Sequence, residues 1–274
     1  MACFDKCLKC LSLVPWGTLI ATVICWAGTA LFCGTGHEAL TYSYQLLNSA
    51  NITGFSWNTT QADEAFQSFK YAIYGIASYM FLLSVVLFVD GVLSTRTIKS
   101  DYEESCKTSV CGLCVGIFYT VIAYVTGIAW LVMICFVALP VYFMVVVYSQ
   151  CIYVEQPTTT NSDFVCLDFV QSGLMHPDYS GSKDYGRLCG DDLKDLCKQP
   201  EVVMTYQLFI IALVGAALVV LSMKQYAMCL TANFAYVKMT RKLAVYEDAK
   251  YKEEMELNDI INTARSNERL TYKY

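Results

Sequence analysis

Cysteine is the residue type with the widest chemical range in this chain. Most of its 14 cysteines fall into three groups, while only two histidines occur, His37 and His176. A thiol beside a membrane can carry a fatty acid, whereas paired thiols in an oxidising compartment form disulfides. The side of the membrane that each group faces therefore decides its chemistry.

The first group precedes an apolar run from Trp16 to Cys33, and Lys6 and Lys9 accompany it. Clustered thiols and lysines beside a membrane span predict S-palmitoylation. Free thiols in a reducing cytosol are the plainer alternative, and zinc is disfavoured because no histidine accompanies them. The run is long for a signal peptide and has no convincing cleavage site, so we expect an uncleaved first span. The group consists of Cys3, Cys7 and Cys10.

The second group lies in a short segment of mixed charge, just before the longest apolar run of the chain. If this segment is cytosolic, its thiols stay reduced and are available for acylation. The Cys-x2-Cys spacing of its last two members is half of a zinc site, but a partner pair is not evident. The group consists of Cys106, Cys111 and Cys114.

The third group follows the long apolar run and is even in number. In an oxidising compartment four cysteines predict two disulfides, and the sequence alone allows three pairings. We expect the bridges to be needed here, because the segment offers little apolar content for a core. Apart from one or two helical turns over Asp191 to Cys197, an irregular structure is expected. The group consists of Cys151, Cys166, Cys189 and Cys197.

The remaining polar residues give no sign of catalysis. No nucleophile motif and no paired carboxylates in an apolar setting occur, so we predict that the chain is not an enzyme and carries no cofactor. His37 with Glu38 is better explained as a polar pair at the end of a span, capping it or packing against the second loop, than as a metal site. A basic surface for nucleic acid is also lacking.

The elements that position these groups are membrane spans. Hydrophobic residues make up 56% of the chain and charged residues 16%, which is typical of a polytopic membrane protein. No charged residue occurs from Thr108 to Val154. The apolar part, Val115 to Tyr148, exceeds the roughly 20 residues that cross a bilayer. It must tilt, kink at Pro140 or project from the membrane.

The fold class expected is an all-α membrane protein, a four-helix transmembrane bundle with a disulfide-stapled second extracellular loop. Lysine and arginine flank the spans on one side, which predicts that both termini are cytosolic. The first outer loop then holds the sequons at Asn51 and Asn58. The predicted spans are 15–34, 71–93, 114–150 and 204–237; the segments outside them are 1–14, 35–70, 94–113, 151–203 and 238–274.

Two charged residues fall within the predicted spans. Asp90 and Lys224 each lie about 19–20 residues from the outer end of their span, roughly 28–30 Å deep. An intramembrane ion pair between them would reduce the penalty of burying each charge. The alternative is that Lys224 reaches the headgroups while Asp90 meets Arg96 or water.

The chain from residue 238 onward is charged and helical in composition. Asp248 and Lys252 form a favourable i,i+4 pair, and a narrow apolar stripe follows. A solvated helix and a helix that binds a cytosolic partner are both consistent with this pattern. The stripe consists of Leu257, Ile260, Ile261 and Ala264.

Several stretches resemble the myelin proteolipid protein family. They are FCGTGHEAL at Phe32 to Leu40, KYAIYG at Lys70 to Gly75, CKTSVCG at Cys106 to Gly112, LPVY at Leu139 to Tyr142, and LFI at Leu208 to Ile210 leading to NFAYVK at Asn233 to Lys238. The tail from Tyr246 to Leu257 is similar to that of the neuronal membrane glycoprotein branch. Thr35 stands where a cysteine is usual, and Lys224 where an apolar residue is expected.

The resemblance implies four spans, cytosolic acylated cysteines and two nested disulfides, Cys151 to Cys197 and Cys166 to Cys189. It also implies a structural and interaction protein of the plasma membrane, acting in neurite or filopodium formation or in membrane apposition. Expected partners are membrane lipids, membrane or cell-surface proteins at the outer loops and cytosolic proteins at the tail; a homo-oligomer stays open. The alternative function is a channel or transport modulator.

Overall fold

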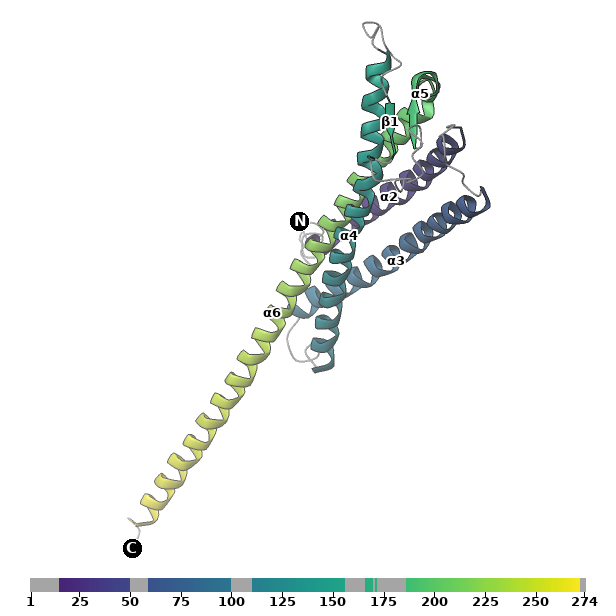
Figure 1. Ribbon diagram of the computed structural model, residues 1–274. Coiled ribbons are helices and arrows are strands. Elements are labelled where there is room, and N and C mark those ends of the chain that lie inside the picture. The colour runs from purple at the N-terminus through teal and green to yellow at the C-terminus, as the bar shows by residue number, and fades with distance from the viewer. Residues whose placement is uncertain are drawn as a thin grey trace, which may run out of the picture. The chain divides into compact units, whose positions relative to one another are not determined.

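In the computed structural model, four long helices form most of the protein (Figure 1). The residues described are 15–49, 59–99, 110–155, 166–169, 171 and 186–271. The long helices are α2 (Trp16–Ser49), α3 (Thr59–Lys99), α4 (Val110–Glu155) and α6 (Pro200–Thr271); the short elements are β1 (Cys166–Asp168), β2 (Arg187–Cys189) and α5 (Gly190–Cys197).

All four long helices are long and apolar enough to cross a membrane. The protein is therefore an all-α membrane protein of four spans, as predicted, to which a small β-hairpin is added. At about 1.5 Å per residue even the shortest of these helices exceeds a hydrocarbon core of about 30 Å. Each helix therefore extends beyond the hydrocarbon, and α4 continues through Pro140.

The polar segment between the first two spans is largely helical. Helix α2 continues to Ser49 and α3 already begins at Thr59. The hydroxyl groups of Thr35, Thr41 and Ser43 donate hydrogen bonds to the carbonyl oxygens four residues earlier. Because these polar side chains bond within their own helix, they do not interrupt it.

The described chain divides into two compact units. One unit comprises Gly17–Phe88 with Ile122–Tyr226, and the other comprises Met1–Trp16, Val89–Val121 and Ala227–Tyr274. We call them the large unit and the small unit. The large unit holds the hairpin, α5 and most of the buried side chains.

In the large unit, α2 and α6 bury stripes that combine small residues with a few large ones. The buried positions of α2 recur every three or four residues, as do those of α6, so that each helix presents one stripe to its neighbours. The stripe of α2 contains Thr18, Ala21, Cys25 and Phe32, and that of α6 contains Ala212, Ala216, Val219, Met223 and Tyr226. Without a hydrophobic driving force in lipid, such close packing holds spans together.

Candidate functional site: the disulfide-linked head

Two nested disulfides join the segment between α4 and α6. Cys151 at the end of α4 bonds to Cys197 at the end of α5, and Cys166 of β1 bonds to Cys189 of β2. The bridges close 46 and 23 residues of sequence. Each restricts the unfolded chain and contributes about 2–4 kcal/mol by that mechanism. We call residues 166–169 and 186–198 the disulfide-linked head.

The head contains an antiparallel hairpin that the sequence did not predict. Leu167 pairs with Leu188 and Asp168 with Arg187. Successive side chains of a strand point to opposite faces, so the two leucines are buried while the charged pair lies outward. Next to the paired strands, the Phe169 N–H donates a hydrogen bond to the Gly186 carbonyl, 2.8 Å long. Gly186 has φ of 70°, which favours glycine.

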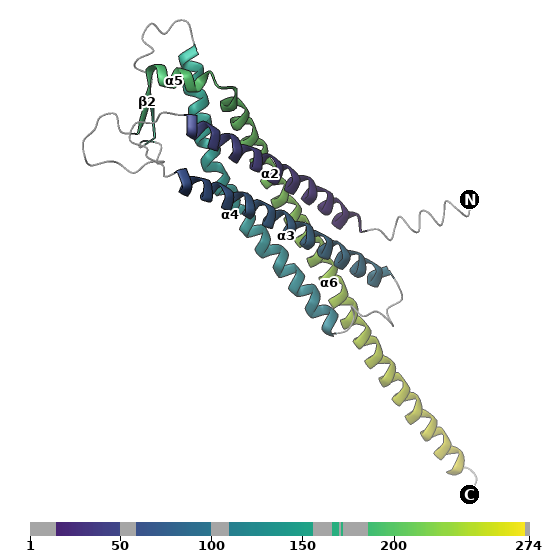
Figure 2. The same cartoon turned by 90° about the vertical axis from the view of Figure 1, so that its right-hand side faces the viewer.

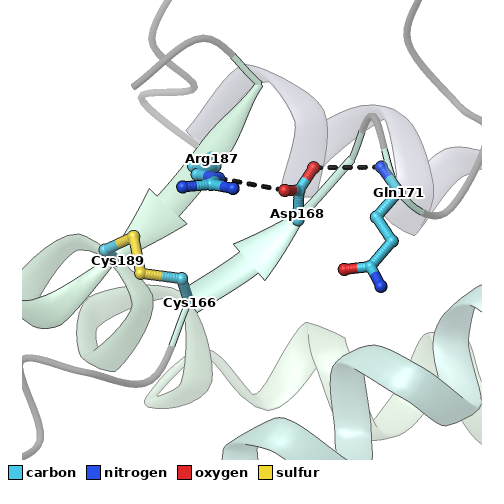
Figure 3. Close-up of polar contacts among 5 residues, drawn as sticks. All are labelled: Cys166, Asp168, Gln171, Arg187 and Cys189. Atoms are coloured by element: carbon cyan, nitrogen blue, oxygen red, sulfur yellow. Dashed lines mark hydrogen bonds and ion pairs between the residues drawn. A yellow bond between two sulfur atoms is a disulfide. The ribbon is translucent and has the colours of Figure 1, made fainter. Parts of the chain in front are cut away.

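Asp168 is the polar centre of the hairpin (Figure 3). Its carboxylate accepts a hydrogen bond from the Arg187 Nε at 2.9 Å and another from the Gln171 backbone N–H at 3.0 Å. The Arg187 side chain is 51% exposed, so water screens the ion pair. We therefore expect this pair to contribute at most about 1 kcal/mol to stability. Its main effect is to fix the geometry of the hairpin.

Helix α5 is amphipathic and covers the hairpin. Leu193 is 0% exposed and Leu196 is buried beside it, whereas the acidic residues lie outward. Two cations bond back to these acids: Lys194 to Asp191 at 3.1 Å and Lys198 to Asp195 at 2.8 Å. The hydrogen bond that Lys198 donates to the Asp195 carboxylate raises the pKa of Lys198 above its usual value. The solvent-facing side of α5 is thus charged and locally paired.

The head has an apolar core shared with the long helices, which corrects our expectation that it lacks the content for one. Four buried leucines of the head lie in one cluster with Leu46 of α2, Met144 of α4 and Val202 of α6. Burying each leucine stabilises by about 1.5–3 kcal/mol. Figure 2 shows β2 and α5 together at one end of the long helices of this unit. The four leucines are Leu167, Leu188, Leu193 and Leu196.

Aromatic side chains join α4 to α6 and to the head. The rings of Tyr148 on α4 and Tyr206 on α6 stack with centroids 4.8 Å apart, and Phe143 lies 5.7 Å from Phe169 of the head. Aromatic pairs of this kind add about 0.5–1.5 kcal/mol beyond the area that they bury. The head is therefore held to the long helices by the Cys151–Cys197 bridge, the leucine core and the contact of Phe143 with Phe169, while the Cys166–Cys189 bridge closes the head internally.

Inside the large unit, buried hydroxyl groups form hydrogen bonds between the helices. The hydroxyls of Thr22 and Tyr226 lie 2.6 Å apart, and the indole N–H of Trp26 donates to the Ser84 hydroxyl at 2.6 Å. The Tyr226 hydroxyl also lies 3.4 Å from the Ser84 carbonyl oxygen. These bonds connect α2, α3 and α6 and satisfy polar groups that lipid could not.

The tightest helix contact lies between two glycines that sequence reasoning missed. A Cβ atom on Gly28 would lie 2.8 Å from the Gly215 carbonyl oxygen, and one on Gly215 would lie 2.7 Å from the Phe32 nitrogen. Only glycine permits this approach of α2 to α6. The small residues Ala212 and Ala216 of α6 flank the contact and are buried. The signal available was the stripe of small residues that continues along α2.

Many predicted modification sites lie outside the described residues. They are Cys3, Cys7, Cys10, Cys106, Asn51 and Asn58; the side chain of Cys111 is also outside them. Cys114 is a free and exposed thiol near the start of α4. His37 lies 3.6 Å from Glu38 and its ring contacts Tyr74 of α3, not the head. In the described part of the chain, no group of three or more metal-ligating side chains gathers.

The charged residues of the spans belong to different units. Asp90 lies in the small unit and is 4% exposed, whereas Lys224 lies in the large unit and is exposed. Asp90 has an interaction partner of its own. The pairing of Asp90 with Lys224 therefore stays a prediction.

The family is decided by comparison with known proteins. A model of the family described as myelin proteolipid protein (PLP or lipophilin) matches residues 4–242. This chain belongs to that family. It is 37% identical to neuronal membrane glycoprotein M6-b of Mus musculus over 98% of this chain and 80% of that protein.

Two further relatives of the chain cover nearly all of it. Neuronal membrane glycoprotein M6-a of Mus musculus and proteolipid protein DM beta of Squalus acanthias are each 38% identical over 98% of this chain and 94% of their own length. No solved structure matches the chain significantly. Membership of this proteolipid family identifies the chain as a non-enzymatic, multi-pass protein of the plasma membrane, in contact with lipids and membrane proteins.

Proposed function

We propose that this proteolipid organises the plasma membrane and cell contacts, with the disulfide-linked head as its outward contact surface. The observation that carries the proposal is the leucine core that the head shares with α2, α4 and α6. A segment anchored in this way presents its charged face in a fixed position, which lowers the entropy lost on contact. An unanchored loop would have to become ordered when it makes the contact, and would lose more entropy.

The proposed orientation places both termini in the cytosol. Lysines near the N-terminus and the cations at Lys238, Arg241 and Lys242 after the last apolar run lie at the predicted inner ends of their spans. Disulfides need an oxidising compartment, which favours an outer position for the head. The sequons at Asn51 and Asn58 lie in the segment that this orientation also places outside.

The charged end of α6 supports a second part of the proposal, recruitment of cytosolic proteins. Beyond the span the helix continues to Thr271, and Lys252 pairs with Asp248 at 3.1 Å. Leu257, Ile260 and Ile261 remain exposed along one side. An exposed apolar stripe on a charged helix is the usual feature of a helix that binds in a partner's groove.

The finer biological role follows from the relatives' branch. Because neuronal membrane glycoproteins are the similar proteins, we place the activity in neurite or filopodium formation or in membrane apposition. A channel or transport modulator is the alternative. The hydroxyl groups of Thr22, Ser84 and Tyr226 inside the large unit take part in hydrogen bonds between helices, which favours packing over a conducting path lined with polar groups.

The test is to express the full chain in cultured neurons and to count filopodia and cell contacts. The head variant Asp191→Asn with Asp192→Asn and Asp195→Asn changes only outward side chains, while Leu193 and Leu196 stay in place. The matched tail variant is Glu253→Gln with Glu254→Gln and Glu256→Gln. Surface delivery of each protein is measured by labelling intact cells.

We expect the head variant to reach the surface normally but to make fewer contacts, because it presents an altered outer face. The tail variant retains contacts, so the two effects are separable. If the head variant makes contacts as well as the unchanged protein, the role assigned to the head is wrong. If neither wild type nor variants change filopodia or contacts, the proposed function itself fails.

A further inference from the structure

A basic pocket lies in the small unit, apart from the disulfide-linked head. It encloses about 470 Å³. One residue comes from α4 and the others from α6, and both parts of the lining belong to the same unit. The lining residues are Ile117, Phe234, Lys238, Arg241, Lys242 and Val245.

The pocket is built by helical periodicity. Its α6 residues are spaced by four, three and four positions, with Lys242 next to Arg241, and so lie on one face of the helix. The excess of Lys and Arg at the cytosolic end of a span does not by itself require the cations to lie on one side of the helix. Here the three cations gather around one hollow.

The chemistry of the lining is divided between charge and apolar surface. Ile117, Phe234 and Val245 supply the apolar part, and none of the described residues that line the pocket is acidic. The Lys238 ammonium lies 5.7 Å from the centre of the Phe234 ring, a distance at which cation and ring attract. Among the residues that the structure describes, none of the three pocket cations forms an ion pair with a carboxylate.

This combination fits a phosphorylated, lipid-attached group. Arginine binds phosphate through two parallel hydrogen bonds, and lysine acts as a point charge. Three cations exceed the single charge of a phosphodiester and offset most of the charge of a headgroup that carries additional phosphate monoesters, each with about −1.5 to −2 charge. The apolar residues suit the glycerol and first methylene groups of a lipid. The cations of the pocket begin at Lys238, where the apolar run of α6 ends.

We infer that Lys238, Arg241 and Lys242 bind the phosphorylated headgroup of a phosphoinositide in the inner leaflet. The assignment to the inner leaflet rests on the proposed orientation of the termini, whereas the binding chemistry is independent of that orientation. A soluble inositol phosphate shares the headgroup chemistry but lacks the lipid part. The lipid is favoured because half of the lining residues are apolar and the pocket lies at the end of a span.

The experiment measures binding of phosphatidylinositol 4,5-bisphosphate to the purified full chain in detergent by native mass spectrometry. The pocket variant is Arg241→Gln with Lys242→Gln. Its matched control is Lys250→Gln with Lys252→Gln, which removes the same charge from the same helix outside the pocket, where both lysines already pair with acids. Thermal stability is recorded for each variant.

We expect the pocket variant to bind the lipid about tenfold to thirtyfold more weakly, because two cations near an anionic headgroup are lost. The control should change affinity less than about twofold. Equal losses in both variants would overturn the inference, because binding would then follow net charge alone. A pocket variant with unchanged affinity would overturn it as well.

Two further experiments distinguish the lipid from a soluble inositol phosphate and test the orientation of the chain. Soluble inositol 1,4,5-trisphosphate should compete weakly; if it binds as tightly as the lipid, the lipid assignment is wrong. Binding in detergent does not depend on orientation because both faces are accessible. Labelling of Ser266→Cys with a membrane-impermeant reagent in intact cells tests orientation separately. Labelling there would refute the inner leaflet and the proposed orientation, and leave the pocket chemistry standing.

Discussion

The contact between Gly28 and Gly215 makes a sharp prediction about how the spans are held together. A Cβ on Gly215 would lie 2.7 Å from the Phe32 nitrogen, while ordinary contacts begin at 3.4 Å. The two backbones must then separate by about 0.7 Å, the difference of these distances. The two nearest atoms, the Phe32 nitrogen and the Gly28 carbonyl oxygen, belong to the backbone and cannot move aside as a flexible side chain could.

This separation has an energetic cost that can be estimated. A gap of about 0.5–1 Å removes a quarter to a half of the dispersion energy of the atoms that face it. It would also lengthen the bond between Thr22 and Tyr226, which is now 2.6 Å. Overpacking typically costs about 1–3 kcal/mol, and the helix preference of alanine returns up to about 1 kcal/mol. We expect Gly215→Ala to lower the free energy of unfolding by about 1–2 kcal/mol.

The control is Gly34→Ala on α2, where a Cβ would meet no atom within 4 Å. That variant should be as stable as the unchanged protein or slightly more stable. The double variant Gly28→Ala with Gly215→Ala should cost clearly less than the sum of the two single costs, because one separation relieves both clashes. Unfolding is followed by tryptophan fluorescence during SDS titration in mixed micelles. Equal stability of Gly215→Ala and Gly34→Ala would refute the reasoning.

Four other predictions concern modification and charge. Native protein should protect Cys151, Cys166, Cys189 and Cys197 from alkylation until reduction, and a free Cys166 would contradict the nested bridges. Hydroxylamine should release fatty acid from the N-terminal thiols and from the group before α4, and loss of signal in serine variants of Cys3, Cys7, Cys10, Cys106, Cys111 and Cys114 assigns the sites. A deglycosidase should shift gel mobility in a glycosylating host, and Asn51→Gln with Asn58→Gln should abolish that shift; an unchanged mobility of the original chain would argue against an accessible outer loop. For the ion pair, Asp90→Lys with Lys224→Asp should restore surface delivery lost in each single exchange, and a double exchange no better than the worse single would end that hypothesis.

The spans were predictable because a bilayer imposes a strong requirement on sequence. Every backbone polar group must be bonded within lipid, so a spanning segment is a long apolar helix. The uncharged run from Thr108 to Val154 therefore identifies α4 without any tertiary information. The helix ends were not predictable in the same way, since α2 and α3 continue where the sequence becomes polar.

The head was only partly predictable, for a different reason. Its strands are three residues each, too short to show a period of two against a polar background. Its core leucines, such as Leu167 and Leu193, are isolated in sequence and meet only after the chain folds onto α4 and α6. The glycine contact was missed similarly, because Gly28 and Gly215 lie on different helices and neither forms a repeated glycine motif.

The central claim is that this proteolipid joins membrane surfaces through an anchored outer head and does not conduct ions. The most direct measurement reconstitutes the full chain into liposomes and records vesicle clustering and ion flux on the same preparation. The account predicts clustering that is lost in the variant Asp191→Asn with Asp192→Asn and Asp195→Asn, with no flux above that of empty liposomes. Flux through unclustered vesicles would contradict the account and support the channel alternative.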